Sequence, residues 1–188
     1  MHDIEPHYNW RNYYIASKDP HSPFYGHKNS EVYFTDTIYN HYIHPQWDSF
    51  GSLTMYMKLL YCDYEKAFCI IEFIGEWNDL IYNDIMYFYR EVAEVLIDKG
   101  IKYFILLGDN VLNFHADGND YYSEWFDNIE EGWIAGVNFR KHILEEMTKY
   151  HIDYYILTGG NLNQVPWRSM NPEDLFVYID KMVMKRLQ

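Results

Sequence analysis

Cysteine and positive charge are both scarce in this sequence. Two cysteines in 188 residues are fewer than many secreted domains of this size carry, which favours a reducing, cytoplasmic location. Only 15 Lys and Arg residues face 28 Asp and Glu residues, so the formal net charge is −13. An electric field of this sign repels phosphate backbones and anionic lipid heads, and it argues against nucleic-acid binding.

The sequence also lacks long apolar runs. The longest strongly apolar run, from Tyr103 to Leu107, is far shorter than the ~20 residues that a membrane-spanning helix needs. The first residues are acidic and show neither the basic nor the apolar region of a signal peptide. We therefore expect a soluble protein that does not bind a membrane.

Several catalytic motifs are missing as well. The chain has no glycine-rich phosphate loop, no GxGxxG dinucleotide motif and no GxSxG nucleophile elbow. A calcium loop counted from Asp117 lacks its central glycine and its terminal Glu, and His41 and His44 have no third zinc ligand nearby. No cofactor is evident, and these absences argue against the common nucleotide enzymes.

Residues 1–50 differ in composition from the rest of the chain. They hold four of the six prolines, six of the nine histidines and twelve aromatic residues, with regular patterning only near Glu31 to Tyr39, where a strand is expected. Such a segment is too apolar for a solvated tail. We expect an irregular arm that packs its rings onto the main domain or onto a second copy of the chain. The candidates for burial are Trp10, Tyr14, Phe34, Tyr39 and Trp47.

Residues 51–188 show the pattern of a single α/β domain. Two β-rich runs joined by a short loop predict an antiparallel hairpin that pairs Cys62 with Ala67. Apolar residues at helical spacing, punctuated by Gly100 and Pro172, predict three helices and two buried strands after the hairpin. The expected strands are 53–62, 67–74, 101–107 and 152–157, and the expected helices are 79–99, 133–150 and 172–187. The apolar face of the first helix is expected to be Ile81, Ile85, Phe88, Val92 and Val95.

This order predicts a mixed sheet, in which an antiparallel hairpin is followed by a parallel β-α-β-α-β-α unit with helices packed on it. Segments 101–107 and 152–157 are expected to be parallel and central. The order resembles, in topology, STAS-type domains such as the anti-sigma-factor antagonists, over residues 53–187. The position of that family's phosphorylatable Ser or Thr reads Gly108-Asp109-Asn110 here, so the resemblance transfers no functional residue.

Polar residues follow both predicted parallel strands. Ligands of open α/β sheets usually bind beyond the carboxyl ends of the strands. Asp109 and Asn110 follow the first of these strands, and Thr158 and Asn161 follow the second. Ordinary turn chemistry also explains Gly, Asn and Asp at such positions, and both interpretations stay open.

The segment from Asp109 to Glu131 is the most informative. It holds seven carboxylates, and no Lys or Arg occurs between Lys102 and Arg140. Our leading hypothesis is a non-enzymatic regulatory or scaffolding module that binds another protein through this acidic, aromatic loop. The binding residues would be Asn110, Glu124, Trp125, Trp133, Thr158 and Asn161, and the arm would join this interface or form a homo-oligomer. The alternative is a cation-dependent hydrolase that uses Asp109, His115, Asp117 and Asp120 with a divalent cation.

Overall fold

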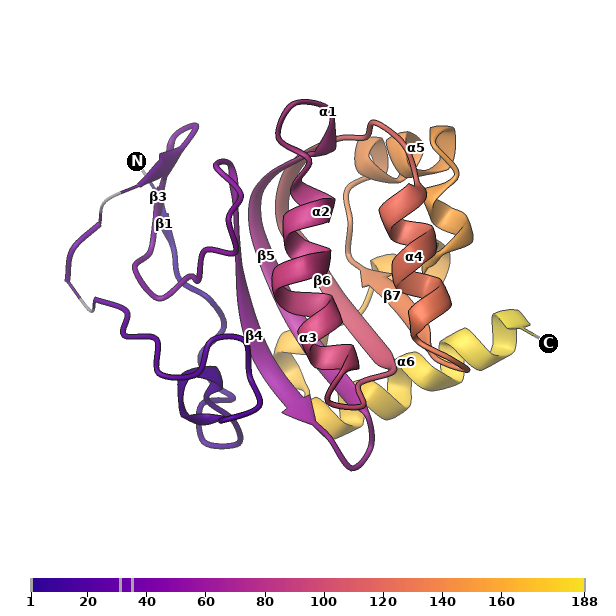
Figure 1. Cartoon of the computed structure of the whole chain (residues 1–188), viewed down its shortest axis with the longest axis horizontal. Helices are drawn as coiled ribbons and strands as arrows, with labels where there is room; N and C mark the ends of the chain where they lie inside the picture. Colours follow the sequence, from indigo (N-terminus) through magenta and orange to yellow (C-terminus); the bar gives the residue numbers. More distant parts are fainter. Residues whose placement is uncertain (1, 31, 35, 188) are drawn as a thin grey trace.

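The computed structural model of the chain describes residues 2–30, 32–34 and 36–187. Its centre is a sheet in the order β4-β5-β6-β7-β8, so that neighbours in space are also neighbours in sequence (Figure 1). β4 is antiparallel to β5, and β5 to β8 are parallel. The strands are β4 (Met55–Asp63), β5 (Phe68–Asn78), β6 (Tyr103–His115), β7 (Trp133–Val137) and β8 (Ile156–Leu157). The α/β class with a mixed sheet is therefore confirmed.

The β4–β5 hairpin forms where the sequence predicts it, but its register differs. Cys62 faces Cys69, whereas the prediction paired Cys62 with Ala67. The Asp63 carboxylate accepts hydrogen bonds from the backbone N–H groups of two loop residues, and Ala67 adopts a left-handed φ of 59°. The loop therefore lies one residue further along the chain than predicted. Both thiols are buried and free.

The helix predicted after β5 forms in two parts. The Asn78 side chain caps α1 (Asp79–Tyr82) by accepting a hydrogen bond from the N–H of Ile81 at 3.0 Å. Asn83 then takes a left-handed φ of 54° and separates α1 from a longer helical segment. That segment runs through α2 (Asp84–Phe88), the π-helical turn η2 (Tyr89–Ala93) and α3 (Glu94–Ile97). Because α1 is a separate turn, Ile81 is exposed, and its assignment to the apolar face was wrong.

The segment expected to be a long polar loop is strand and helix instead. β6 continues past its predicted end at Leu107 as far as His115, which pairs with Asn78 of β5. The helix α4 (Asp120–Asn128) follows. Tyr122 and Trp125 are buried at helical spacing, so α4 packs on the sheet through its apolar side.

The predicted helix 133–150 was wrong in its first half. All five residues of β7 are buried between β6 and β8. A short apolar run fits a buried strand and a buried helical turn equally well, so the periodicity could not separate them. Asn138 ends the strand with a φ of 56°, and α5 (Lys141–Lys149) forms the second half.

Half of the predicted strand 152–157 is helical. Ile152–Tyr154 form the 3-10 turn η3, and only the two residues of β8 pair with β7. β8 is parallel as expected, but it lies at the edge of the sheet and not at its centre. The last helix, α6 (Pro172–Leu187), begins as predicted, where the Asn171 side chain accepts a hydrogen bond from the N–H of Asp174 at 2.9 Å.

Helices cover both faces of the sheet (Figure 1). Side chains of α2, α3, α4 and α5 share one core with the sheet, and α6 shares a second core on the opposite face. No helix within residues 2–30, 32–34 and 36–187 combines the length and the hydropathy needed to cross a membrane.

The arm lies along the β4 side of the sheet (Figure 1). Its regular elements are the short turn η1 (Ala16–Lys18) and a small sheet in the order β1-β3-β2, made of β1 (His2–Ile4), β2 (Thr37–Ile38) and β3 (His41–Ile43). Part of the strand expected near 31–39 is β2, whereas positions 31 and 35 lie outside the described residues. The other described residues of the arm are largely irregular, as predicted.

The arm contributes to the cores of the domain. Trp10 and Trp47 are buried and Tyr14 is half-buried, whereas Phe34 and Tyr39 are exposed. Asp48 exchanges two backbone hydrogen bonds with Met57 of β4. This bridge covers part of the edge strand, which would otherwise present free N–H and C=O groups.

Candidate functional site

An acidic pocket of about 300 Å³ lies at the carboxyl ends of β5 and β6. We call it the acidic pocket and define it by Asp79, Leu80, Ile81, Asp117, Asp120 and Tyr121. No Lys, Arg or His belongs to its lining, as far as the described residues go. The position agrees with the rule that ligands bind beyond the carboxyl ends of strands. The sequence predicted that this edge of the sheet lies at Asp109. Because β6 continues to His115, the edge lies further along the chain.

Asp79 is the fixed carboxylate of the pocket. Its Oδ1 accepts hydrogen bonds from the Trp77 indole at 2.9 Å and from the Ile85 N–H at 2.8 Å, and its Oδ2 accepts one from the Tyr122 hydroxyl at 2.6 Å. Burial raises the pKa of Asp79 to about 7, although these hydrogen bonds oppose the shift. The nearby Asp84 is fully buried, and burial raises its pKa too. Asp79 therefore joins β5, α2 and α4 at the base of the pocket.

The rim of the pocket is exposed and mixed in character. Asp117 and Asp120 are exposed carboxylates on the segment that leads from β6 into α4. On the α1 side, Leu80 is 59% exposed and Ile81 is 69% exposed. The rim thus offers two aliphatic side chains beside two negative charges, an arrangement suited to a cationic group on an apolar chain.

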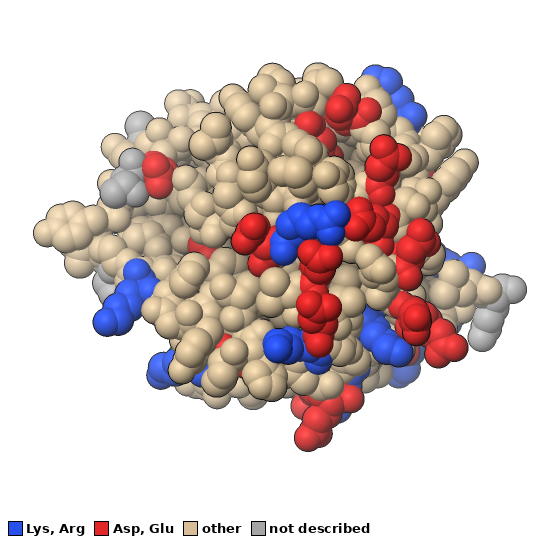
Figure 2. Space-filling model, viewed as in Figure 1, with Lys and Arg blue, Asp and Glu red and all other residues tan. Residues whose placement is uncertain are grey.

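Negative charge continues from the pocket along α4. Figure 2 shows acidic side chains gathered over the face that carries α3 and α4. The carboxylates of this acidic ridge are Asp120, Glu124, Asp127, Glu130 and Glu131. Arg90 lies beside it and pairs with Glu94 at 2.9 Å and with Glu124 at 3.0 Å, so its charge is neutralised.

His115 stands at the end of β6, outside the lining of the pocket. Its Nε2 lies 3.5 Å from a Glu76 carboxylate oxygen and 3.0 Å from the Asn113 amide nitrogen. Residues rise about 3.3 Å each along a strand, which separates His115 from Asp109 by roughly 20 Å. The four residues of the hydrolase hypothesis therefore lie in three places. Among the described residues, no group of three or more His, Cys, Asp or Glu side chains is arranged to hold a metal ion.

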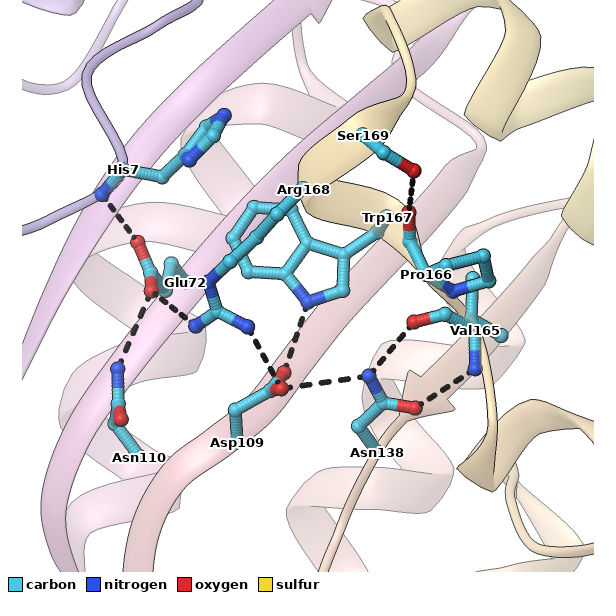
Figure 3. A network of polar contacts seen from close by, with 10 residues as sticks. All are labelled: His7, Glu72, Asp109, Asn110, Asn138, Val165, Pro166, Trp167, Arg168 and Ser169. Carbon is cyan, nitrogen blue, oxygen red and sulfur yellow. Dashed lines mark hydrogen bonds and ion pairs between the residues drawn. The ribbon is translucent and has the colours of Figure 1, made fainter.

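Asp109 belongs to a separate polar network (Figure 3). It lies in an irregular stretch of β6, where the register with β5 shifts after Leu107. Its carboxylate accepts hydrogen bonds from the Trp167 indole and from the Arg168 guanidinium, both at 2.9 Å. Both donors come from the 3-10 turn η5 (Trp167–Ser169), so Asp109 anchors this turn to the sheet.

Glu72 is the buried centre of the same network (Figure 3). It is 1% exposed, and it accepts hydrogen bonds from the backbone N–H of His7 at 2.8 Å and from the Asn110 amide at 3.3 Å. Arg168 lies 3.5 Å away. Burial raises the pKa of Glu72 to about 7, although these partners, including the Arg168 charge, oppose the rise. The network ties the arm and η5 to β5 and β6.

The remaining residues proposed from the sequence lie apart from the acidic pocket. Trp125 is fully buried in the core beneath α4, and Trp133 is buried on the α6 side, where its indole donates to Asp180. Neither ring can serve as an exposed anchor for a partner. The carbonyl of Thr158 accepts a hydrogen bond from Arg186, and Asn161 is exposed in the turn η4 (Gly160–Asn163).

Sequence reasoning found Asp117 and Asp120 but missed the α1 side of the pocket. Asp79 was not among the candidate residues, and Ile81 was assigned to a buried face. One signal was present: Asn83 favours the left-handed backbone that ends α1. The arm residue His7 and the loop residue Arg168 carry no comparable signal.

No protein-family model matches this chain, and no curated protein matches it in sequence. We therefore infer function from the geometry of the chain itself.

Proposed function

We propose that this chain is a non-enzymatic binding module whose acidic pocket takes a basic, partly apolar segment of another protein. The observation that carries the proposal is the rim, where Leu80 and Ile81 are exposed beside carboxylates that no lining cation neutralises. The leading hypothesis from the sequence also used the acidic segment. It placed the apolar contacts at Trp125 and Trp133, which are buried, whereas Leu80 and Ile81 are exposed.

Charge and apolar surface have different effects on binding at such an interface. The carboxylates of the acidic ridge attract a basic segment from a distance, which mainly raises the association rate and weakens with salt. Full burial of an aliphatic side chain contributes roughly 1.5–3 kcal/mol, so Leu80 and Ile81 would supply much of the affinity. Each effect predicts a different response to mutation and to ionic strength.

The base of the pocket is fixed before any partner arrives. Asp79 is held by three hydrogen bonds from Trp77, Ile85 and Tyr122. A site that is rigid in the free protein loses less entropy on binding. The hydrolase hypothesis lacks comparable support, because its candidate residues are distributed and Asp109 is occupied by Trp167 and Arg168.

A short synthetic amphipathic peptide of Lys and Leu tests the proposal by calorimetric titration. We expect Leu80→Ser with Ile81→Ser to weaken binding by about tenfold or more at every salt concentration. Asp117→Asn with Asp120→Asn should weaken binding mainly at low salt. The matched controls are Leu53→Ser, another exposed aliphatic residue, and Glu145→Gln with Asp98→Asn, two exposed carboxylates outside the pocket. Equal effects of the control and pocket variants would overturn the proposal.

A further inference from the structure

A second cavity, of about 340 Å³, lies beneath the arm, where the arm crosses β4. We call it the arm cavity and define it by His7, Trp10, Arg11, Phe24, Lys28 and Lys58. It shares no lining residue with the acidic pocket. Its volume is at the lower end of the range for small-molecule sites, which suits a small ligand and excludes a folded partner.

The charge of the arm cavity opposes that of the whole chain. Arg11, Lys28 and Lys58 line it, whereas Asp48 is the one carboxylate among its described lining residues. Asp48 is buried and already paired, since it accepts hydrogen bonds from Lys58 at 3.0 Å and from Asn29 at 2.8 Å. Arg11 and Lys28 therefore leave the cavity with an excess of positive charge, in a chain whose net charge is −13.

These two cations keep donors for a ligand. Among the described residues, Arg11 makes one long hydrogen bond, 3.4 Å to the Gln46 side chain, and its guanidinium lies 5.6 Å from the centre of the Tyr8 ring. A guanidinium has five N–H donors, so most of them remain available. Lys28 forms no ion pair with any residue that the structure describes. An anion between Arg11 and Lys28 would thus gain new hydrogen bonds without breaking an existing ion pair.

The apolar part of the cavity is buried and the cationic part is exposed. Trp10, Phe24 and Leu59 are all nearly inaccessible to solvent, whereas Arg11 and Lys28 are exposed. The cavity therefore has an apolar floor and a cationic rim. That division matches an amphipathic molecule, which places a charged group at the rim and its body against the floor.

His7 adds a polar atom to the wall. Its ring is held edge-on by Trp10 and by Trp167, with ring centres 4.9 Å away in both cases. Its Nε2 is buried and has no hydrogen-bond partner among the described residues. A smaller cavity of about 280 Å³, lined by Glu72 and Arg168, meets the arm cavity at Pro6 and His7.

We propose that the arm cavity binds a small organic anion, whose charged group pairs with Arg11 and Lys28 and whose apolar body contacts Trp10 and Phe24. This site is independent of the acidic pocket, and neither proposal requires the other.

Two fluorescent probes of nearly the same shape test the proposal. Anilinonaphthalene sulfonate carries an aromatic body and a negative charge, and N-phenylnaphthylamine carries the same body without the charge. We expect the sulfonate to bind the native chain more tightly than the uncharged probe. Arg11→Gln with Lys28→Gln should weaken sulfonate binding by about tenfold or more and leave binding of the uncharged probe unchanged, because hydrogen bonds to charged groups are lost only for the anion.

A substitution that fills the cavity shows whether the probes bind there, and the removal of two charges outside the cavity is the control. Ser17 lines the cavity, so Ser17→Trp should reduce binding of both probes. Lys99→Gln with Lys102→Gln removes two exposed charges outside the lining of the cavity and should change neither affinity. Chemical denaturation of each variant shows whether it is folded, and if Ser17→Trp does not fold, the Arg11 and Lys28 variant decides. Equal affinities of the two probes, no binding of either probe, or equal effects of the two charge variants would overturn the proposal.

Discussion

The acidic pocket and the arm cavity lie in one chain and are built by different means. The acidic pocket comes from residues at the ends of regular elements, where β5 leads into α1 and β6 leads into α4. The arm cavity comes from an irregular segment laid against β4, and its position depends on buried rings such as Trp10. Strand topology alone therefore brings the first set of side chains together, whereas the second set requires long-range packing.

The comparison also shows how little the net charge says about a single site. Fifteen basic residues are few for this length, yet three of them line one cavity, while the acidic pocket has none in its described lining. Local potentials depend on which charges share a concave surface. A negative net charge therefore argues against large polyanions, but it does not exclude a small organic anion.

The arm should contribute more to stability than the rim of the acidic pocket does. Trp10 is buried against His7 and Trp167, and its indole donates to the Met170 carbonyl at 2.9 Å. Replacing it by Ala should lower the free energy of unfolding by about 3–5 kcal/mol, as for other large buried side chains. Urea denaturation measures this change, with the exposed Tyr13→Ala as the control. A loss below about 1 kcal/mol would mean that the arm is not part of the folded core.

A pH effect is expected from two buried carboxyl groups, Asp79 at the base of the acidic pocket and Glu72 in the polar network beside the arm. The pKa of Asp79 is raised from 3.8 to about 7 and that of Glu72 from 4.5 to about 7. Both groups hold their proton more tightly in the folded state, so the free energy of unfolding should fall as pH rises from about 4 to about 7. One pKa unit corresponds to about 1.4 kcal/mol, so each group contributes a decrease of about 4 kcal/mol at most.

Denaturation at several pH values, with Asp79→Asn and Glu72→Gln, measures each contribution. Each variant should show a smaller decrease between pH 4 and pH 7 than the unmodified chain does, because it cannot ionise at that position. Unchanged slopes in both variants would show that neither carboxyl group titrates in this range.

A substitution of Arg168 should change the pKa of Glu72 and leave that of Asp79 unchanged. It lies 3.5 Å from Glu72 and has no contact with the acidic pocket. Arg168→Met should raise the pKa of Glu72 further, because a nearby positive charge is lost, and should leave the pKa of Asp79 unchanged. Carbon-13 NMR of the side-chain carboxyl groups measures both values. A lower pKa of Glu72 in this variant would contradict the role given to Arg168.

The smallest effect is expected at the exposed rim. Leu80→Ser and Ile81→Ser should each change the free energy of unfolding by about 0.5 kcal/mol or less, since exposed side chains contribute little to folding. The same variants are expected to weaken peptide binding strongly. A large loss of stability would show instead that these side chains serve the fold.

Much of the fold could be predicted from sequence periodicity. Apolar spacing, together with Gly100, Asn171 and Pro172, predicts the hairpin, the parallel strands after it and the last helix. The errors fall where short apolar runs are ambiguous. Trp133 to Val137 is a strand because it lies between two other strands, and tertiary contacts of that kind leave no periodic signal.

The sites were less predictable than the fold. Asp117 and Asp120 could be named from the sequence because they follow a recognisable strand, and Asp109 lies apart from them because β6 continues beyond it. Arg11 and Lys28 could not be found, because they meet only after the arm folds back across β4. Charge and hydrophobicity along the chain indicate local pairs well, but they do not indicate which distant segments share a cavity.

The central claim is that one domain holds two binding sites of opposite charge. Backbone amide chemical shifts, recorded by NMR during separate titrations, test it most directly. The basic peptide should shift amides of residues 79–85 and 117–121, and anilinonaphthalene sulfonate should shift those of residues 7–17, 24–29 and 58–60. Shifts of the same residues by both ligands, or shifts spread evenly over the surface, would contradict the claim.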